Sequence, residues 1–180
     1  MELTHLYISS GHNYFGHHNQ APGHHAMIAV QEVRCRAARG IEGDRFFDYA
    51  ENYKGQITFF AQEVYETLRE QFQVWDKSPA VFRRNAITRQ ANLNALIGVE
   101  FELQGVRFLG VEECKACHWM DHAFHPGAEK ALAGRGGLRA RILTDGILRV
   151  TRGADSSAST VDSRALAAKA RESRSLVSTI

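Results

Sequence analysis

Two of the three cysteines in this sequence, Cys114 and Cys117, form a Cys-x-x-Cys pair, and three histidines follow the pair closely. The histidines are His118, His122 and His125. A segment of this kind can bind a structural zinc ion, form a redox-active thiol pair, or present one reactive sulfur atom. The three possibilities require different groups around the cysteines, so the neighbouring residues help to distinguish them.

A structural zinc site would need two ligands in addition to Cys114 and Cys117. The sequence has no second Cys-x-x-Cys pair, and His122 and His125 are closer together than the histidines of zinc fingers. A zinc-stabilised binding module that uses both cysteines and a histidine pair therefore remains as an alternative without catalytic activity. A thioredoxin-like pair is disfavoured, because that motif begins a helix after a βα turn, whereas a predicted hairpin strand precedes Cys114.

The third interpretation is a single nucleophilic or sulfur-carrying residue, Cys117. A thiol reacts as the thiolate, and positive neighbours lower its pKa. The residues that can supply positive charge are Lys115, His118, Arg135, Arg139 and Arg141. A buried and inert cysteine is the opposing interpretation, and residue chemistry alone leaves the two open.

Two further segments have the composition of anion-binding loops. Near Gly136, a glycine-rich turn can present successive backbone amides to a phosphate, and Arg135 can add charge. The loop that contains Asp44 and Arg45 also has flanking glycines, and its two charges can either face a cleft or pair with each other. Five more histidines lie between residues 12 and 25, which indicates that the two histidine-rich segments meet at one polar site.

The composition is typical of one globular domain. A chain of 180 residues that is 44% hydrophobic can form one core. Its formal net charge of +2 does not indicate nucleic-acid binding, which needs basic residues in runs or on one face. We find no signal-peptide pattern and no apolar stretch near the roughly 20 residues that cross a bilayer. We therefore expect a cytoplasmic protein that binds neither nucleic acid nor membranes.

The elements expected to position these residues are mainly strands. Alternating apolar residues predict a β-hairpin over residues 99–113, and Asp145-Gly146 predicts a second hairpin over residues 138–151. Apolar residues at helical spacing predict an amphipathic helix over residues 61–73, after a strand at residues 55–60. The expected fold is an antiparallel β-barrel with a few helices over residues 1–153. Residues 154–180 are rich in Ser, Ala and charge, and are expected to form a flexible tail.

The order of several sequence blocks resembles the MOSC domain, named for the C-terminal domain of molybdenum cofactor sulfurases. The resemblance runs from about residue 3 to residue 153. The blocks are GIEGDRFF (40–47), GQITFFAQEVYETL (55–68), FRRNAIT (82–88), LNALIGVEFELQGVRFLGVEECKAC (93–117) and HPGAEKALAGRGGLRARILTDG (125–146). The family fold is a β-barrel with helical additions, in agreement with the predicted strands.

The resemblance also implies roles for individual residues. The family is thought to hold sulfur, or a sulfur-ligated molybdenum cofactor, on one cysteine after a strand, and Cys117 matches this position, with Asp121 as its companion. Cys114 matches a less regular place and is either a resolving thiol or a packed residue. The FRRN segment resembles the part of the family that approaches the anionic cofactor, which implies that Arg83 and Asn85 contact it.

Two functions follow from the resemblance. In the first, Cys117 carries a persulfide that it receives from a cysteine desulfurase, and pyridoxal phosphate belongs to that partner. In the second, Cys117 ligates molybdenum, and the protein reduces N-hydroxylated compounds with electrons from a reductase. A family member that has lost its chemistry is a further possibility.

Overall fold

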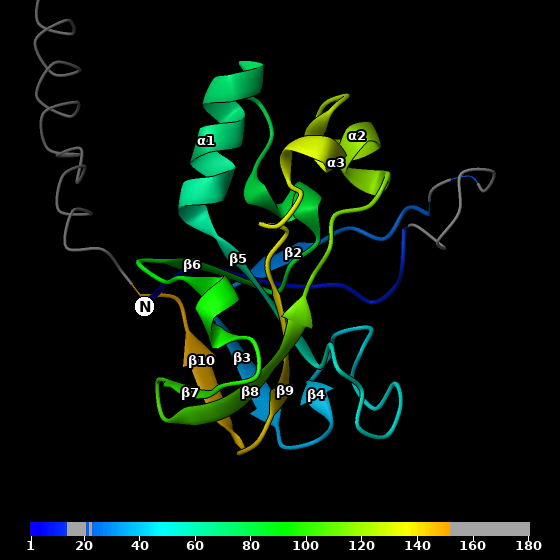
Figure 1. Cartoon of the computed structure of the whole chain (residues 1–180). Coiled ribbons are helices and arrows are strands. Elements are labelled where there is room, and N and C mark those ends of the chain that lie inside the picture. The colour runs from blue at the N-terminus through cyan, green and yellow to red at the C-terminus, as the bar shows by residue number, and fades with distance from the viewer. Residues whose placement is uncertain (14–20, 22, 152–180) are drawn as a thin grey trace, which may run out of the picture.

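The computed structural model describes residues 1–13, 21 and 23–151 (Figure 1). The predicted tail, residues 154–180, lies outside the described residues, as do His17 and His18. The strands are β1 (Glu2–Ile8), β2 (Ile28–Val30), β3 (Glu32–Arg36), β4 (Gly40–Ile41), β5 (Ile57–Ala61), β6 (Ala86–Arg89), β7 (Glu100–Leu103), β8 (Val106–Glu113), β9 (Leu138–Ile142) and β10 (Gly146–Arg149). The helices are α1 (Gln62–Phe72), α2 (Trp119–Ala123) and α3 (Ala128–Ala131), with 3₁₀ turns η1 (Pro79–Phe82) and η2 (Leu93–Leu96).

The described strands form two sheets. The larger has seven strands in the order β2-β1-β6-β5-β9-β8-β7, and the smaller has three in the order β10-β3-β4. All neighbours pair antiparallel except β5 and β6, which run parallel. The prediction of a mainly β fold with a few helices is confirmed. The predicted antiparallel barrel needs correction: the described strands form no closed barrel, and the larger sheet is mixed, because α1 carries the chain across so that β6 runs in the same direction as β5.

The larger sheet separates two hydrophobic cores. Strand β5 shows the division, because successive side chains point to opposite faces of a sheet. Phe59 packs with residues of the smaller sheet such as Val33 and Leu148. Phe60 packs on the other face with Leu68 of α1 and with residues of α2 and α3. The helices therefore lie together at one end of the molecule and the smaller sheet at the other, as Figure 1 shows.

The first predicted hairpin is confirmed, and the second is wrong. Strands β7 and β8 pair through a turn at Gln104 and Gly105, which both have positive φ, as a type I′ turn requires. Strands β9 and β10 both exist, but β9 pairs with β5 and β8, whereas β10 pairs with β3. The Asp145 carboxylate is bonded to the backbone of Ala37, so it attaches this turn to the smaller sheet.

The predicted amphipathic helix is confirmed as α1. It buries Tyr65 and Leu68 against the sheet and ends at Gln73, whose left-handed conformation closes the helix. Among the described residues, no helix combines the length and the apolar character that crossing a membrane requires.

Candidate functional site

A cleft with a volume of about 160 Å³ brings together both cysteines of the Cys-x-x-Cys pair. Four arginines line it, and no aspartate or glutamate is among its lining residues. The charged and sulfur-containing side chains are Arg45, Arg83, Arg84, Arg139, Cys114 and Cys117, with Met120. The remaining lining residues are His12, Asn13, Phe46, Tyr53, Gly55, Thr58, Phe82 and Trp119. A cleft with this composition favours an anionic ligand that can react with or bind to sulfur.

Two consecutive arginines reach the cleft in different ways because of the backbone at Arg83. This residue follows η1 and has a left-handed conformation with a φ of 57°. Its guanidinium group contacts the N-terminal segment, where it donates to the carbonyls of His25 and Gly11 at 2.7 Å and to Ser9 Oγ at 3.0 Å. It also lies 5.9 Å from the centre of the Trp119 ring. Arg83 therefore joins the N-terminal segment to one wall of the cleft.

Arg84 connects the cysteine segment to the glycine-rich turn. Its buried guanidinium donates to the carbonyls of Cys114 at 2.7 Å, Phe82 at 2.9 Å and Gly136 at 3.1 Å. Gly136 must be a glycine for steric reasons, since a Cβ atom there would lie 2.5 Å from the Cys114 carbonyl oxygen. The Gly136 amide donates to the Glu113 carboxylate at 3.1 Å. The glycine-rich turn therefore supports the backbone that carries the thiols.

The thiols differ in burial. Cys114 is buried at the end of β8, Cys117 is partly exposed, and Cys35 lies in the core. Burial raises the pKa of Cys117, while the Trp119 amide and Arg84 act in the opposite direction without cancelling the effect. Burial also raises the pKa of Cys35, to about 12. The Cys117 sulfur is accessible from the cleft, but at neutral pH its resting form is the thiol.

Arg83 keeps its positive charge in the cleft. Burial lowers the pKa of Arg83 to about 10, with a further contribution from Arg45, so this guanidinium is protonated at neutral pH. Burial likewise lowers the pKa of Arg45, and Asp44 opposes this effect. Arg139 has a buried Nε that lacks a hydrogen-bond acceptor among the described residues, although the Glu112 carboxylate lies 3.6 Å away.

Asp44 and Asn85 belong to a buried network behind the cleft. The Asp44 carboxylate accepts from the Ser9 amide and from Asn85 Nδ2, both at 3.1 Å. The Asn85 side-chain oxygen accepts from the amide and the hydroxyl of Thr58, and its Nδ2 also donates to the Tyr7 carbonyl. The structure therefore places these two residues where they hold β1, β5 and the loop after β4 together, and neither lines the cleft.

Three other predicted residues are not among the lining residues of the cleft. Asp121 Oδ1 accepts from the Glu129 amide at 2.7 Å, which ties α2 to α3. His118 Nδ1 lies 4.0 Å from the Glu129 carboxylate. Arg135 donates to the Ala131 carbonyl and lines a different pocket. Of the predicted site residues, the cleft collects Cys114, Cys117, Arg45 and Arg83.

The sequence did not single out Arg84, Tyr53, Thr58 or Trp119. Arg139 was expected only as a possible source of positive charge near the thiol. Arg84 lies inside the FRRN block, so this block was the sequence signal that could have identified it. The block did not indicate which of its two arginines would contact the cysteine segment. For the zinc alternative, the described residues contain no group of three convergent His, Cys, Asp or Glu ligands that includes either cysteine.

The sequence model of the MOSC domain matches residues 27–153, which is more than half of the chain. No curated protein sequence matches the chain significantly. Among solved structures, the YuaD protein from Bacillus subtilis is similar, with a TM-score of 0.58 and 12% identity over 82% of this chain and 94% of that chain. YiiM from Geobacillus stearothermophilus has a TM-score of 0.58 and 14% identity over 86% of this chain and 77% of that chain. YiiM from Escherichia coli has a TM-score of 0.57 and 15% identity over 86% and 72%.

At these identities, the solved structures support the fold alone, and the match to the sequence model carries the assignment. The matched region includes every predicted block from GIEGDRFF to the turn at Asp145, and both cysteines of the cleft. The chain therefore belongs to the MOSC domain family.

Proposed function

We propose that the protein binds the molybdenum cofactor in the arginine-lined cleft, with Cys117 as the protein ligand of molybdenum. The observation that carries this proposal is the composition of the cleft, in which four guanidinium groups and two thiols occur without a lining carboxylate. Guanidinium groups bind phosphate and other oxyanions through paired, charge-assisted hydrogen bonds. The residues present therefore fit a ligand that combines a phosphate with a thiophilic metal.

The protonation state of Cys117 supports metal ligation over free nucleophilic attack. Burial raises the pKa of this thiol, so the reactive thiolate is a minor form in the free protein at neutral pH. A metal ion removes the proton of a coordinating thiol outright. Cys117 can therefore be a slow nucleophile in the free protein and still be a strong ligand for a bound metal.

The other residues of the cleft have distinct roles in this proposal. Arg83 and Arg139 bind the anionic groups of the cofactor, and Arg84 positions the backbone that carries Cys117 through its contacts with the carbonyls of Cys114, Phe82 and Gly136. The cleft, at about 160 Å³, is smaller than the roughly 300–1,000 Å³ of typical small-molecule sites, so it encloses part of the cofactor. When bound, the cofactor supplies two-electron redox chemistry at the metal. The proposed reaction is reduction of N-hydroxylated compounds, with electrons from a separate reductase.

A second candidate function is transport of sulfane sulfur, and Cys114 favours it because a second thiol lines the same cleft. The Cys117 thiolate would attack the terminal sulfur of a persulfide on a pyridoxal-phosphate-dependent cysteine desulfurase. The sulfur–sulfur bond of the donor breaks, the donor cysteine leaves as a thiolate, and Cys117 becomes the persulfide. Cys114 would then attack the inner sulfur of this persulfide, which forms a Cys114–Cys117 disulfide and releases the terminal sulfur as hydrosulfide.

The two functions are separated by analysing the purified protein. The chain is produced anaerobically in a host that makes the molybdenum cofactor and in one that does not, and molybdenum and pterin are quantified. The first function predicts stoichiometric molybdenum from the competent host alone, loss of it in Cys117→Ser, and reduced content in Arg139→Gln. The matched control is Arg149→Gln, an exposed arginine on β10 outside the cleft.

Unchanged molybdenum content in Cys117→Ser would contradict the assignment of the ligand. Absence of both molybdenum and pterin from the wild-type protein, together with a mass increase of one sulfur atom on Cys117 after incubation with a desulfurase, would support the carrier function instead.

A further inference from the structure

We propose that His118, Asp121 and Glu129 form a binding site for a divalent transition-metal ion, at the junction of α2 and α3. This site is separate from the molybdenum ligand proposed above, because it uses neither cysteine. It also differs from the zinc site that the sequence allowed, which relied on Cys114 and Cys117.

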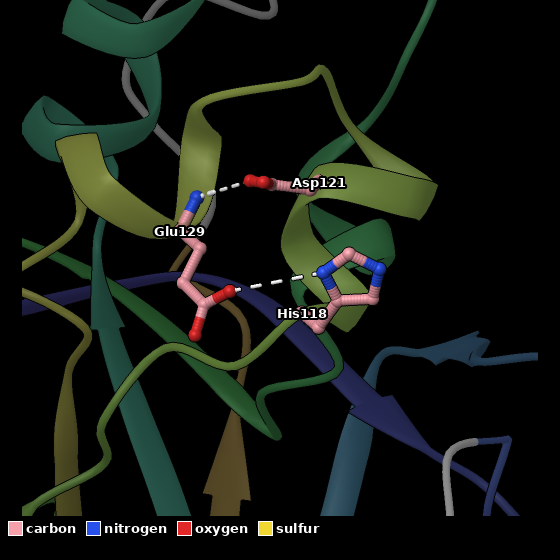
Figure 2. Close-up of side chains that lie close together, drawn as sticks. All are labelled: His118, Asp121 and Glu129. Carbon is pink, nitrogen blue, oxygen red and sulfur yellow. Dashed lines mark hydrogen bonds and ion pairs between the residues drawn. The ribbon is translucent and has the colours of Figure 1, made fainter. Parts of the chain in front are cut away.

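The three side chains converge from two helical segments, as Figure 2 shows. One ligand atom from each residue lies within 4.8 Å of the others, and they form the only such group in the part of the chain that the structure describes. His118 Nδ1 lies 4.0 Å from Glu129 Oε2. A small inward movement of these partly exposed side chains would bring all three to the roughly 2.0–2.2 Å at which histidine and carboxylate ligands bind zinc.

The backbone fixes this arrangement before any metal binds. His118 and Asp121 are three residues apart at the start of α2, so they lie on the same face of the helical turn. Asp121 Oδ1 accepts from the backbone amide of Glu129 at 2.7 Å, which sets the position of α3 relative to α2. Buried residues beneath, including Met120 and Ala128, pack both segments on the same core. The ligands are thus held by a rigid support rather than by a mobile loop.

The local charge also favours a cation. Neither the Asp121 nor the Glu129 carboxylate has a lysine or arginine within 4.0 Å among the described residues, and His118 is the only ion-pair partner described for Glu129. This differs from the nearby cleft, where the positive charges belong to arginines. Two adjacent carboxylates repel each other, and a divalent ion between them would remove that repulsion.

The ligand set indicates the class of metal. One imidazole nitrogen and two carboxylate oxygens suit Zn²⁺, Co²⁺ or Mn²⁺, whereas Ca²⁺ and Mg²⁺ prefer oxygen ligands alone. Three protein ligands leave at least one position for water or another small ligand. A metal here would lock α2 to α3 directly beside the segment that carries Cys117.

The test is metal binding to the full chain, measured by titration calorimetry with Zn²⁺ and by absorption spectroscopy with Co²⁺. Variants His118→Gln and Glu129→Gln remove one ligand each, and Glu129→Gln leaves the backbone contact to Asp121 intact. We expect each to weaken Zn²⁺ binding by more than the roughly 10–100-fold that loss of an outer-shell contact causes. The matched controls are His122→Gln, on the same helix, and Glu70→Gln, an exposed residue of α1; neither should change the affinity.

A Cys114→Ser, Cys117→Ser double variant distinguishes this site from metal binding by the thiols and from the proposed molybdenum site. The inference requires that Zn²⁺ binding persist in this variant and that bound Co²⁺ show no thiolate charge-transfer band in the wild-type protein. Loss of Zn²⁺ binding in the double variant, equal affinity in Glu129→Gln, or no measurable binding by the wild-type protein would each overturn it. Loss of molybdenum with retained Zn²⁺ binding would leave the inference intact.

Discussion

Replacing Arg84 with glutamine tests the claim that this buried guanidinium holds the cysteine segment in place. Arg84 donates to the carbonyls of Cys114, Phe82 and Gly136 at 2.7, 2.9 and 3.1 Å. A glutamine side chain is shorter and has one amide nitrogen, which cannot reach carbonyls on three separate segments, so we expect two of the three to lose their donor. The segment from Cys114 to Cys117 would then be attached to β6 less firmly.

The size of the effect can be estimated from these contacts. Hydrogen bonds to a charged group contribute about 1.5–3 kcal/mol each, so losing two of them costs about 3–6 kcal/mol. The guanidinium no longer has to be buried, which offsets part of this loss. A net decrease of about 3 kcal/mol in the free energy of unfolding is therefore expected. With an m-value of about 2 kcal/mol/M, the urea midpoint should fall by about 1.5 M.

The assay is urea unfolding monitored by tryptophan fluorescence, together with the alkylation rate of Cys117 in the native protein. Arg84→Lys keeps the charge without the planar fork and should lie between the wild type and Arg84→Gln. Arg149→Gln is the matched control, since its exposed pair with Glu32 contributes at most about 1 kcal/mol. A midpoint shift below about 0.5 M in Arg84→Gln, with unchanged alkylation of Cys117, would refute the reasoning.

Three further predictions concern the network behind the cleft, the glycine-rich turn and the thiol. Asn85→Ala removes the bonds to Thr58 and should destabilise the protein by about 3 kcal/mol, measured by urea unfolding; a loss under about 1 kcal/mol would contradict the network. Gly136→Ala places a methyl group 2.5 Å from the Cys114 carbonyl oxygen, so it should lower the Tm and speed alkylation of Cys117, and unchanged values for both would count against a tight contact. Because burial raises the pKa of Cys117, its alkylation rate should still be rising with pH above the pKa of free cysteine, about 8.5, and a plateau below that pH would show a stabilised thiolate. Cys35 does not interfere with this measurement, since it is buried in the core.

The sequence located the site segment but not all of its residues. The FRRN block does lie at the cleft, yet Arg84 reaches the cysteines and Asn85 faces the interior. The cause is the left-handed backbone of Arg83, which redirects the residues that follow and which no residue type at that position signals. A glycine there would have indicated it; an arginine does not.

Strand pairing is a second feature that local sequence patterns could not predict. The turn at Asp145-Gly146 and both flanking strands were predicted from local patterns, because turn residues and alternating side chains depend on near neighbours. Which strand β10 pairs with depends instead on Leu148 and Val33, which are buried together in the core between the two sheets. These two residues are far apart in sequence. A short local pattern cannot contain that information, so the hairpin prediction was wrong while its elements were correct.

The central position of β9 constrains when the cleft can exist during synthesis. Among the described strands of the larger sheet, β9 lies between β5, on the side that carries Arg83 and Arg84, and β8, which leads to the cysteines. Until residues 138–142 have left the ribosome, the arginine half and the thiol half of the site have no sheet joining them. A nascent chain shorter than this would lack the assembled cleft, so a ligand proposed to bind there could do so only after β9 has been translated.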